Sequence, residues 1–229
     1  GRGRDLEREY VEGMHWDGSL LSRDLATDMA KLRAEQEDAA VLVSNLEIND
    51  PRELAEFLGR CAEAGVTTLF IVAQHIGGEA LGALALNHAA GRMKLAAARP
   101  ARSADTARAD LEDLATLTGA RGCYADAGGA LRAVRVEELG KARRIWADKD
   151  YLGVAGGGGA PRRVRQHLAE LRGLYQRAAG DPRNALRRRI GKLLGGSATL
   201  WIGAATEAAM EARKTLADRT AESLRAALI

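Results

Sequence analysis

Residues 50–91 read DPRELAEFLGRCAEAGVTTLFIVAQHIGGEALGALALNHAAG and carry a helix signal, a strand signal and a second helix signal in succession. Asp50, Pro51 and Glu53 occupy the N-cap, first-turn and N3 positions of a capping box, so a helix is expected to begin there. Residues 68–73, TLFIVA, form a short apolar run rich in branched side chains, which predicts a strand covered on both faces. This order of elements is typical of an α/β protein.

The second of these helices, expected from Gly78 to Ala89, carries apolar side chains nearly all round its axis. A helix that lies on a sheet buries one stripe, so the surplus predicts an apolar patch beside Leu58 on the shoulder of the first helix. The alternative is that a neighbouring loop or domain covers the surplus. The site favoured by the pattern is an apolar groove between the two helices.

Length and composition set the class of protein. The chain has 229 residues, enough for one large or two small domains, and 46% are hydrophobic while 4% are aromatic. Cys61 and Cys123 lack the CxxC spacing of a metal or redox site, which predicts free thiols in a reduced compartment. No apolar run is long enough for a membrane span or a secretion signal, so we expect a cytoplasmic protein without a membrane partner.

The rest of the chain continues the α/β alternation. Residues 20–32 are expected to form a partly exposed loop with apolar anchors. Strands are expected at 8–13, 39–43, 93–98, 121–125, 143–148, 151–154 and 197–202, with helices at 105–117 and from 207 onwards. The first and last strands connect the terminal segments to the body, and glycines stand at both crossings. Gly13, Gly195 and Gly196 are therefore predicted to act as a hinge.

Residues 153–161, GVAGGGGAP, stand between a predicted strand and a predicted helix. Such a loop could cradle a phosphate, because bare backbone N–H groups and a helix N-terminus attract anions. The glycine spacing matches neither GxGxxG nor GxxxxGK[ST], which favours a plain turn.

Residues 161–192 predict a helical hairpin with ten basic residues, opposed by Glu170 and Asp181 alone. Such a field could attract an acidic protein or a nucleic acid, which makes an adaptor of that kind the alternative function. Nucleic acid is disfavoured because no aromatic side chains are interleaved for stacking on bases. A merely solvated helix surface also remains open.

Six blocks in order resemble the bacterial group I chaperonins of the GroEL type. They are VEGMHWD (11–17), GGEALGALALN (77–87), DLATLTG (113–119), VEELGKARR (136–144), KLLGG (192–196) and GAATEAAM (203–210). The resemblance implies an α/β fold like the GroEL apical domain, with sheets flanked by helices, over residues 14–195. Residues 1–13 and 196–229 would be segments of a small α/β intermediate domain.

The same resemblance implies a molecular chaperone fragment that binds non-native polypeptide, and a lid co-chaperonin as a further partner. The implied polypeptide-binding residues are Leu20, Leu25, Leu58, Leu81, Ala85, Leu86 and Asn87. Asp24, Ala55 and Ala85 depart from the family, which has large apolar groups at these positions.

The resemblance further implies that the parent protein assembles as a ring homo-oligomer. ATP and Mg would belong to an equatorial domain outside this sequence, so no cofactor, metal or catalytic residue is assigned here and the fragment is not expected to be an enzyme. Arg219 stands where the family has an aspartate that assists ATP hydrolysis, which implies impaired hydrolysis in the parent.

Overall fold

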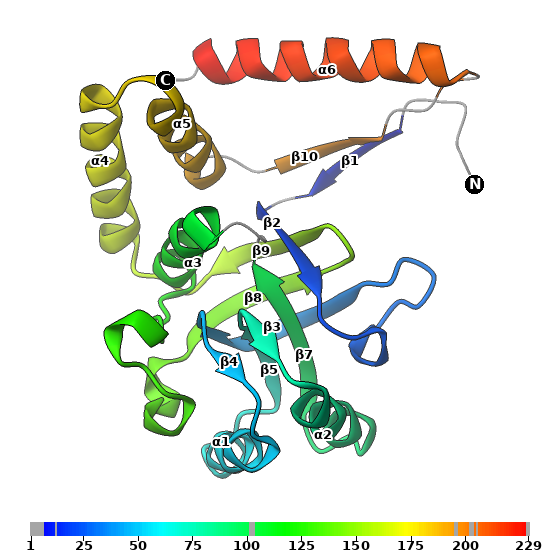
Figure 1. The fold of residues 1–229 in the computed structure, drawn as a ribbon, viewed down its shortest axis with the longest axis vertical. Coiled ribbons are helices and arrows are strands. Elements are labelled where there is room, and N and C mark those ends of the chain that lie inside the picture. The colour runs from blue at the N-terminus through cyan, green and yellow to red at the C-terminus, as the bar shows by residue number, and fades with distance from the viewer. Residues whose placement is uncertain are drawn as a thin grey trace.

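A closed six-stranded barrel forms the centre of the molecule (Figure 1). The computed structural model describes residues 7–11, 13–100, 104–194, 197–201, 204 and 206–227. Round the barrel, the strands follow the order β2 (Met14–Leu20), β7 (Lys94–Pro100), β5 (Thr68–Val72), β3 (Ala34–Val43), β8 (Gly140–Ala147) and β9 (Tyr151–Gly157). The β3, β5 and β7 strands run parallel, whereas the other neighbours pair antiparallel.

The expected GroEL apical-domain-like arrangement of sheets flanked by helices is wrong, although the chain mixes helices and strands as predicted. The physical reason is β2, where no strand was expected. Its first half, Met14–Asp17, pairs with β9, and its second half, Gly18–Leu20, pairs with β7. One strand thus joins the two edges of the sheet, and closure removes the unpaired edges that an open sheet would leave.

Two apolar clusters arise from alternate residues of the same strands, because successive strand side chains point to opposite faces. Leu69 and Ile71 of β5 point toward the cluster that includes the helices α1 (Pro51–Glu63) and α2 (Gly78–Ala89). Phe70 and Val72 point into the second cluster, which contains Trp16 of β2 and the apolar side chains of β8 and β9. The alternation of side chains along each strand therefore supplies both the apolar interior of the barrel and the apolar face that the helices cover.

The remaining elements surround the barrel. Helix α3 (Ala104–Thr118) contacts β3, β7 and β8, and the hairpin α4 (Pro161–Arg177) and α5 (Gly180–Leu194) packs against α3 (Figure 1). The short strands β4 (Glu47–Ile48) and β6 (His75–Ile76) pair in parallel. A two-stranded ribbon, β1 (Glu7–Val11) with β10 (Ser197–Trp201), leads to α6 (Glu207–Ala227). Among the described residues, no helix combines the length and the apolar character that crossing a membrane requires.

Most strongly patterned segments are confirmed. The helix, strand and helix of residues 50–91 form as α1, β5 and α2. The strand expected at 121–125 is wrong: this region forms the 3-10 turns η2 (Ala125–Ala127), η3 (Leu131–Ala133) and η4 (Val136–Glu138), with one isolated bridge from Cys123 to Ser44. The loop expected at 20–32 contains the turn η1 (Arg23–Leu25).

The glycine run at the end of β9, residues 156–159, is explained by its packing against α3. A Cβ atom on Gly157 would lie 2.3 Å from the carbonyl oxygen of Leu117, and one on Gly159 would lie 2.2 Å from that of Thr116. The Gly158 N–H donates to Lys141 O (2.7 Å) and the Gly159 N–H to Leu117 O (2.8 Å). These two amides are satisfied within the fold, which favours the turn interpretation over a phosphate cradle.

We expect Gly159→Ala to lower the free energy of unfolding by about 3 kcal/mol, because the new methyl group meets fixed backbone atoms and not a flexible side chain. Gly173→Ala is the matched control: Gly173 lies within α4 with no atom within 4 Å of its would-be Cβ, so alanine should stabilise by up to about 1 kcal/mol. Urea unfolding measures both. Equal stability of Gly159→Ala and the parent would contradict the packing role.

Candidate functional site

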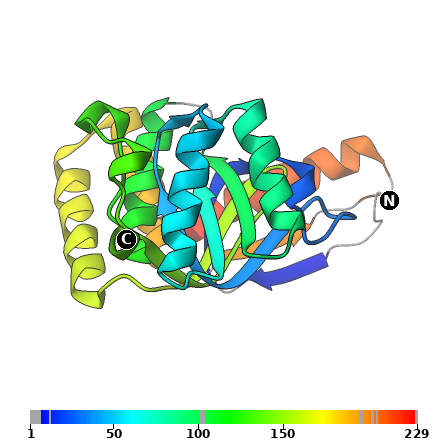
Figure 2. The same ribbon diagram turned by 90° about the horizontal axis from the view of Figure 1, so that it is seen from below.

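The helices α1 and α2 lie side by side over the barrel (Figure 2), at the end away from the α4–α5 hairpin (Figure 1). Helix α1 begins as the sequence predicts: the Asp50 carboxylate accepts from the Arg52 N–H (2.8 Å), and Pro51 opens the helix. Helix α2 begins after Gly77 without a side-chain cap. The apolar groove was expected between these two helices.

Helix α1 seals its main stripe into the core. Leu54, Phe57 and Cys61 are fully buried, and Leu58 retains 8% exposure. Burial raises the pKa of the Cys61 thiol to about 11, so the thiol stays neutral and unreactive. The exposed apolar part of α1 is therefore limited to small residues such as Ala55, and Leu58 contributes little to it.

One flank of α1 is occupied by the turn η3. The Glu53 carboxylate accepts from the Arg132 N–H (3.1 Å), and the Arg60 guanidinium donates to Leu131 O (3.1 Å). At 100° per residue, Leu58 and Ala55 fall on the other flank of the helix. This leaves that flank free of η3.

Helix α2 keeps apolar groups at the surface, as its all-round composition predicted. Ala80 and Leu84 are buried, and Leu81 and Ala85 are partly buried against the core. Leu86 is 73% exposed. Asn87 is partly buried and donates to Ala83 O of its own helix (2.9 Å).

The segment before η1 contributes mainly to the core. Leu20 ends β2 and is partly buried, and Leu25 is fully buried. Asp24 is exposed, and its backbone N–H donates to Oγ of Ser22, which caps the turn (3.2 Å). The turn contacts α2, and Leu20, Leu25, Leu58, Leu81 and Ala85 belong to one apolar cluster, to which Leu86 and Asn87 do not belong. Leu25 and most of Leu58 lie out of reach of a partner.

Of the three glycines predicted to act as a hinge, Gly13 lies within the described residues. Gly13 has φ of +139°, and a Cβ there would lie 2.4 Å from Val154 O, so both backbone conformation and space require glycine. Gly195 and Gly196 lie outside the described residues.

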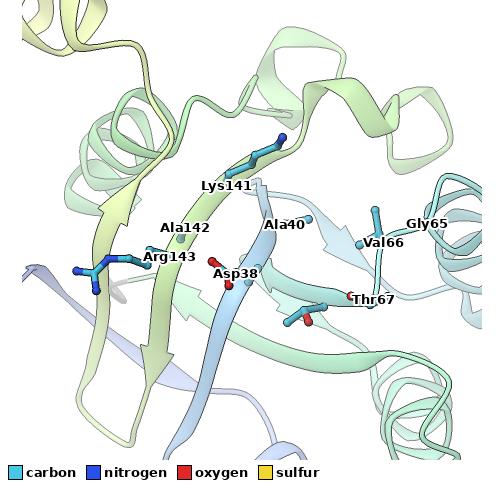
Figure 3. A pocket seen from close by; sticks show the side chains of 10 residues that line it. Asp38, Ala40, Gly65, Val66, Thr67, Lys141, Ala142 and Arg143 are labelled. Carbon is cyan, nitrogen blue, oxygen red and sulfur yellow. The ribbon is translucent and has the colours of Figure 1, made fainter.

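A pocket of about 480 Å³ opens where β3 separates from β5, a place that sequence reasoning did not single out (Figure 3). Asp38 has a left-handed φ of +48°, and the β3–β8 ladder skips it between Glu37 and Ala39. The Lys141 and Arg143 side chains point away from the Asp38 carboxylate. Because ligand sites need polar groups that converge, no chemistry is assigned to this pocket.

Two carboxylates on α3 hold the α4–α5 hairpin in place. The Asp113 side chain is fully buried and accepts two hydrogen bonds from the Arg189 guanidinium (2.9 and 2.7 Å) and one contact from His167 Nε2 (2.6 Å). Asp110 is 4% exposed and lies 3.5 Å from Lys192 Nζ. Charged groups desolvated in this way must be paired, so the cluster fixes how the hairpin sits on α3.

Burial raises the pKa of the Asp110 carboxyl. Lys192 acts to lower this pKa, whereas the neighbouring carboxylates of Asp113 and Asp17 raise it further. The folded protein therefore holds a proton on Asp110 more tightly than the unfolded chain does.

Among the described residues, no group of three or more His, Cys, Asp or Glu side chains is placed so that it could hold a metal ion.

Comparison with known proteins adds a negative finding. No protein-family model matches this chain. The geometry of the two helices therefore carries the functional argument.

We expect Asp113→Asn to lower the free energy of unfolding by about 3 kcal/mol, because it leaves the largely buried Arg189 charge without its partner. Asp181→Asn, at an exposed position on α5, should change stability by no more than about 0.5 kcal/mol. In a double-mutant cycle, Asp113→Leu with Arg189→Met should lose less than the sum of the single changes. Additive losses in urea unfolding would mean that the pair is not coupled.

Asp110→Asn tests the raised pKa. The proton on Asp110 contributes stability that is fully present below the ordinary carboxyl pKa of 3.8 and is lost as the pH rises through the raised folded-state pKa. The asparagine variant does not titrate, so its stability relative to the parent should increase between pH 3 and pH 7. Unfolding free energies measured across this range check the sign. A difference that stays constant or decreases would contradict the raised pKa.

Proposed function

We propose that this chain captures apolar segments of non-native polypeptides on the α1–α2 surface, defined by Leu86, Leu81, Ala85 and Ala55. The observation that carries the proposal is Leu86, which is 73% exposed on a helix whose own core-facing stripe is already complete. Leu81 and Ala85 on the same helix are only partly buried. An apolar side chain from another protein can cover Leu86 and the exposed remainder of its neighbours on α2.

The energetics favour loose, unselective capture. Burying one leucine side chain gains roughly 1.5–3 kcal/mol before the cost of ordering the partner. Leu86 can make one strong contact with the polypeptide, and the accessible part of Leu81 can make one partial contact. Such a surface holds an unfolded chain weakly and without sequence preference, which suits a holding function and not a tight, specific complex.

The resemblance to group I chaperonins supports the same surface and is kept as part of the proposal. Its block GGEALGALALN spans residues 77–87, which form most of α2. A ring homo-oligomer, which the resemblance implies, would display several copies of the surface and raise the affinity by multivalency. A lid co-chaperonin would compete for the same helices. The contribution of Leu25 and Leu58 is indirect in this conformation, because both are buried beneath the surface.

We expect Leu86→Ser to weaken binding of a reduced, alkylated, permanently unfolded test protein by about five- to tenfold, because the variant removes the most exposed apolar side chain of the surface. Leu216→Ser is the matched control, since Leu216 is 66% exposed on α6. Light scattering of the aggregating client and anisotropy of a labelled client give the affinities.

Leu58→Ser is unsuitable as the main variant, because Leu58 packs in the core and its loss would damage the fold. Circular dichroism should show that Leu86→Ser and Leu216→Ser unfold like the parent. Client binding should also persist in 0.5 M salt, since apolar contacts are not screened. Equal binding by Leu86→Ser and the parent would remove the proposal.

A further inference from the structure

The α4–α5 hairpin concentrates positive charge far beyond the average of the chain. Residues 161–194 contain ten basic residues against two acidic ones, a net charge of +8. The whole chain carries +3, so the remaining residues carry −5. The hairpin also lies at the edge of the molecule, with α4 outermost (Figures 1 and 2).

The structure separates the basic residues into two groups. Arg189 and Lys192 face α3 and are bound to Asp113 and Asp110. The other eight form no ion pair with a carboxylate in the part of the chain that the structure describes: Arg162, Arg163, Arg165, Arg172, Arg177, Arg183, Arg187 and Arg188. The field at the surface therefore comes from arginines that form no ion pair with any described acidic side chain.

The chemistry of these arginines matches phosphate. The guanidinium group presents a planar fork of N–H donors that binds phosphate oxygens in pairs. Arg162, Arg165 and Arg172 fall within an arc of about 80° on α4, at 100° per residue. The helix is about 25 Å long, a length of duplex axis that carries on the order of 15 phosphate charges.

A protein partner is less well matched. Protein interfaces depend on clustered apolar or aromatic anchors at their centre. The exposed large apolar side chains of the hairpin are Leu174 and Leu194, which stand at opposite ends because α4 and α5 run antiparallel. The Tyr175 ring is covered by Arg183 at 4.7 Å. The surface thus offers charge without a central anchor.

We propose that the outer face of the α4–α5 hairpin binds the phosphate backbone of nucleic acid without reading its bases. The scarcity of aromatic side chains, which argued against nucleic acid from the sequence, excludes stacking on bases and places no restriction on contacts with phosphates. This surface is separate from α1 and α2, so the inference does not depend on the proposed capture of polypeptides.

The test uses the full chain and a fluorescein-labelled 20-base-pair DNA duplex, with anisotropy measured between 50 and 200 mM salt. The variant Arg162→Gln/Arg165→Gln/Arg172→Gln should bind at least about tenfold more weakly at 100 mM salt. Its slope of log K against log salt should be smaller in magnitude by about 3, since each phosphate contact contributes about 0.9. A second duplex of unrelated sequence should bind the parent equally well.

The matched control removes the same charge elsewhere: Arg52→Gln/Arg92→Gln/Arg132→Gln changes three exposed arginines outside the hairpin and should leave the affinity within about twofold. The Leu86→Ser variant should bind DNA like the parent. Three results would each overturn the inference: no binding at 50 mM salt, equal losses in the hairpin and control variants, or displacement of the duplex by poly-glutamate at the same charge concentration. The last result would identify an acidic protein as the partner.

Discussion

The shared pairing of β2 is the constraint on which the rest of the structure depends. Four of its residues pair with β9 and the next three with β7, so one seven-residue strand closes the barrel. Trp16, at 2% exposure, fills the interior beneath it. The close approach of Gly18 to Arg99 O, 2.8 Å from a would-be Cβ, lets β2 pass from one partner to the other. Without this strand the sheet would have two open edges.

Closure also limits where the apolar α1–α2 surface and the charged surface of the α4–α5 hairpin can lie. A barrel wall has one inner and one outer face, and each strand alternates between them. Leu95 and Ala97 of β7 face the cluster under α1 and α2, whereas Ala96 and Ala98 face the cluster shared with α3. The apolar helices and the arginine hairpin therefore occupy different parts of the molecule. Their separation reflects which apolar cluster each helix covers, because α1 and α2 pack on the first cluster and α3, which holds the hairpin, packs on the second.

The elements that the sequence predicted are those specified by local pattern. Helix α1 has its cap at Asp50, and β5 is an unbroken apolar run, so neither depends on distant residues. In contrast, β2 reads MHWDGSL, with polar and small residues at most positions, and the first half of β3 reads AEQED. Such segments become strands because neighbours far along the chain supply hydrogen bonds. Local propensity could not reveal them, so nothing in the sequence indicated that the sheet closes into a barrel.

The same distinction applies to the candidate sites. Helical periodicity identified the surplus of apolar groups on α2, and Leu86 is exposed accordingly. It could not show that Leu25 is buried, because the packing of η1 against α2 and β7 is tertiary.

Counting charges in the sequence likewise could not show which basic residues of the hairpin reach its surface. Arg188 and Arg189 are adjacent in sequence, yet a turn of 100° exposes the first to solvent and directs the second to Asp113. Composition gives the total charge of a helix, but the buried acids on α3 decide how much of that charge reaches the surface. The arginines that are not engaged in these ion pairs with α3 determine which ligand the hairpin can bind.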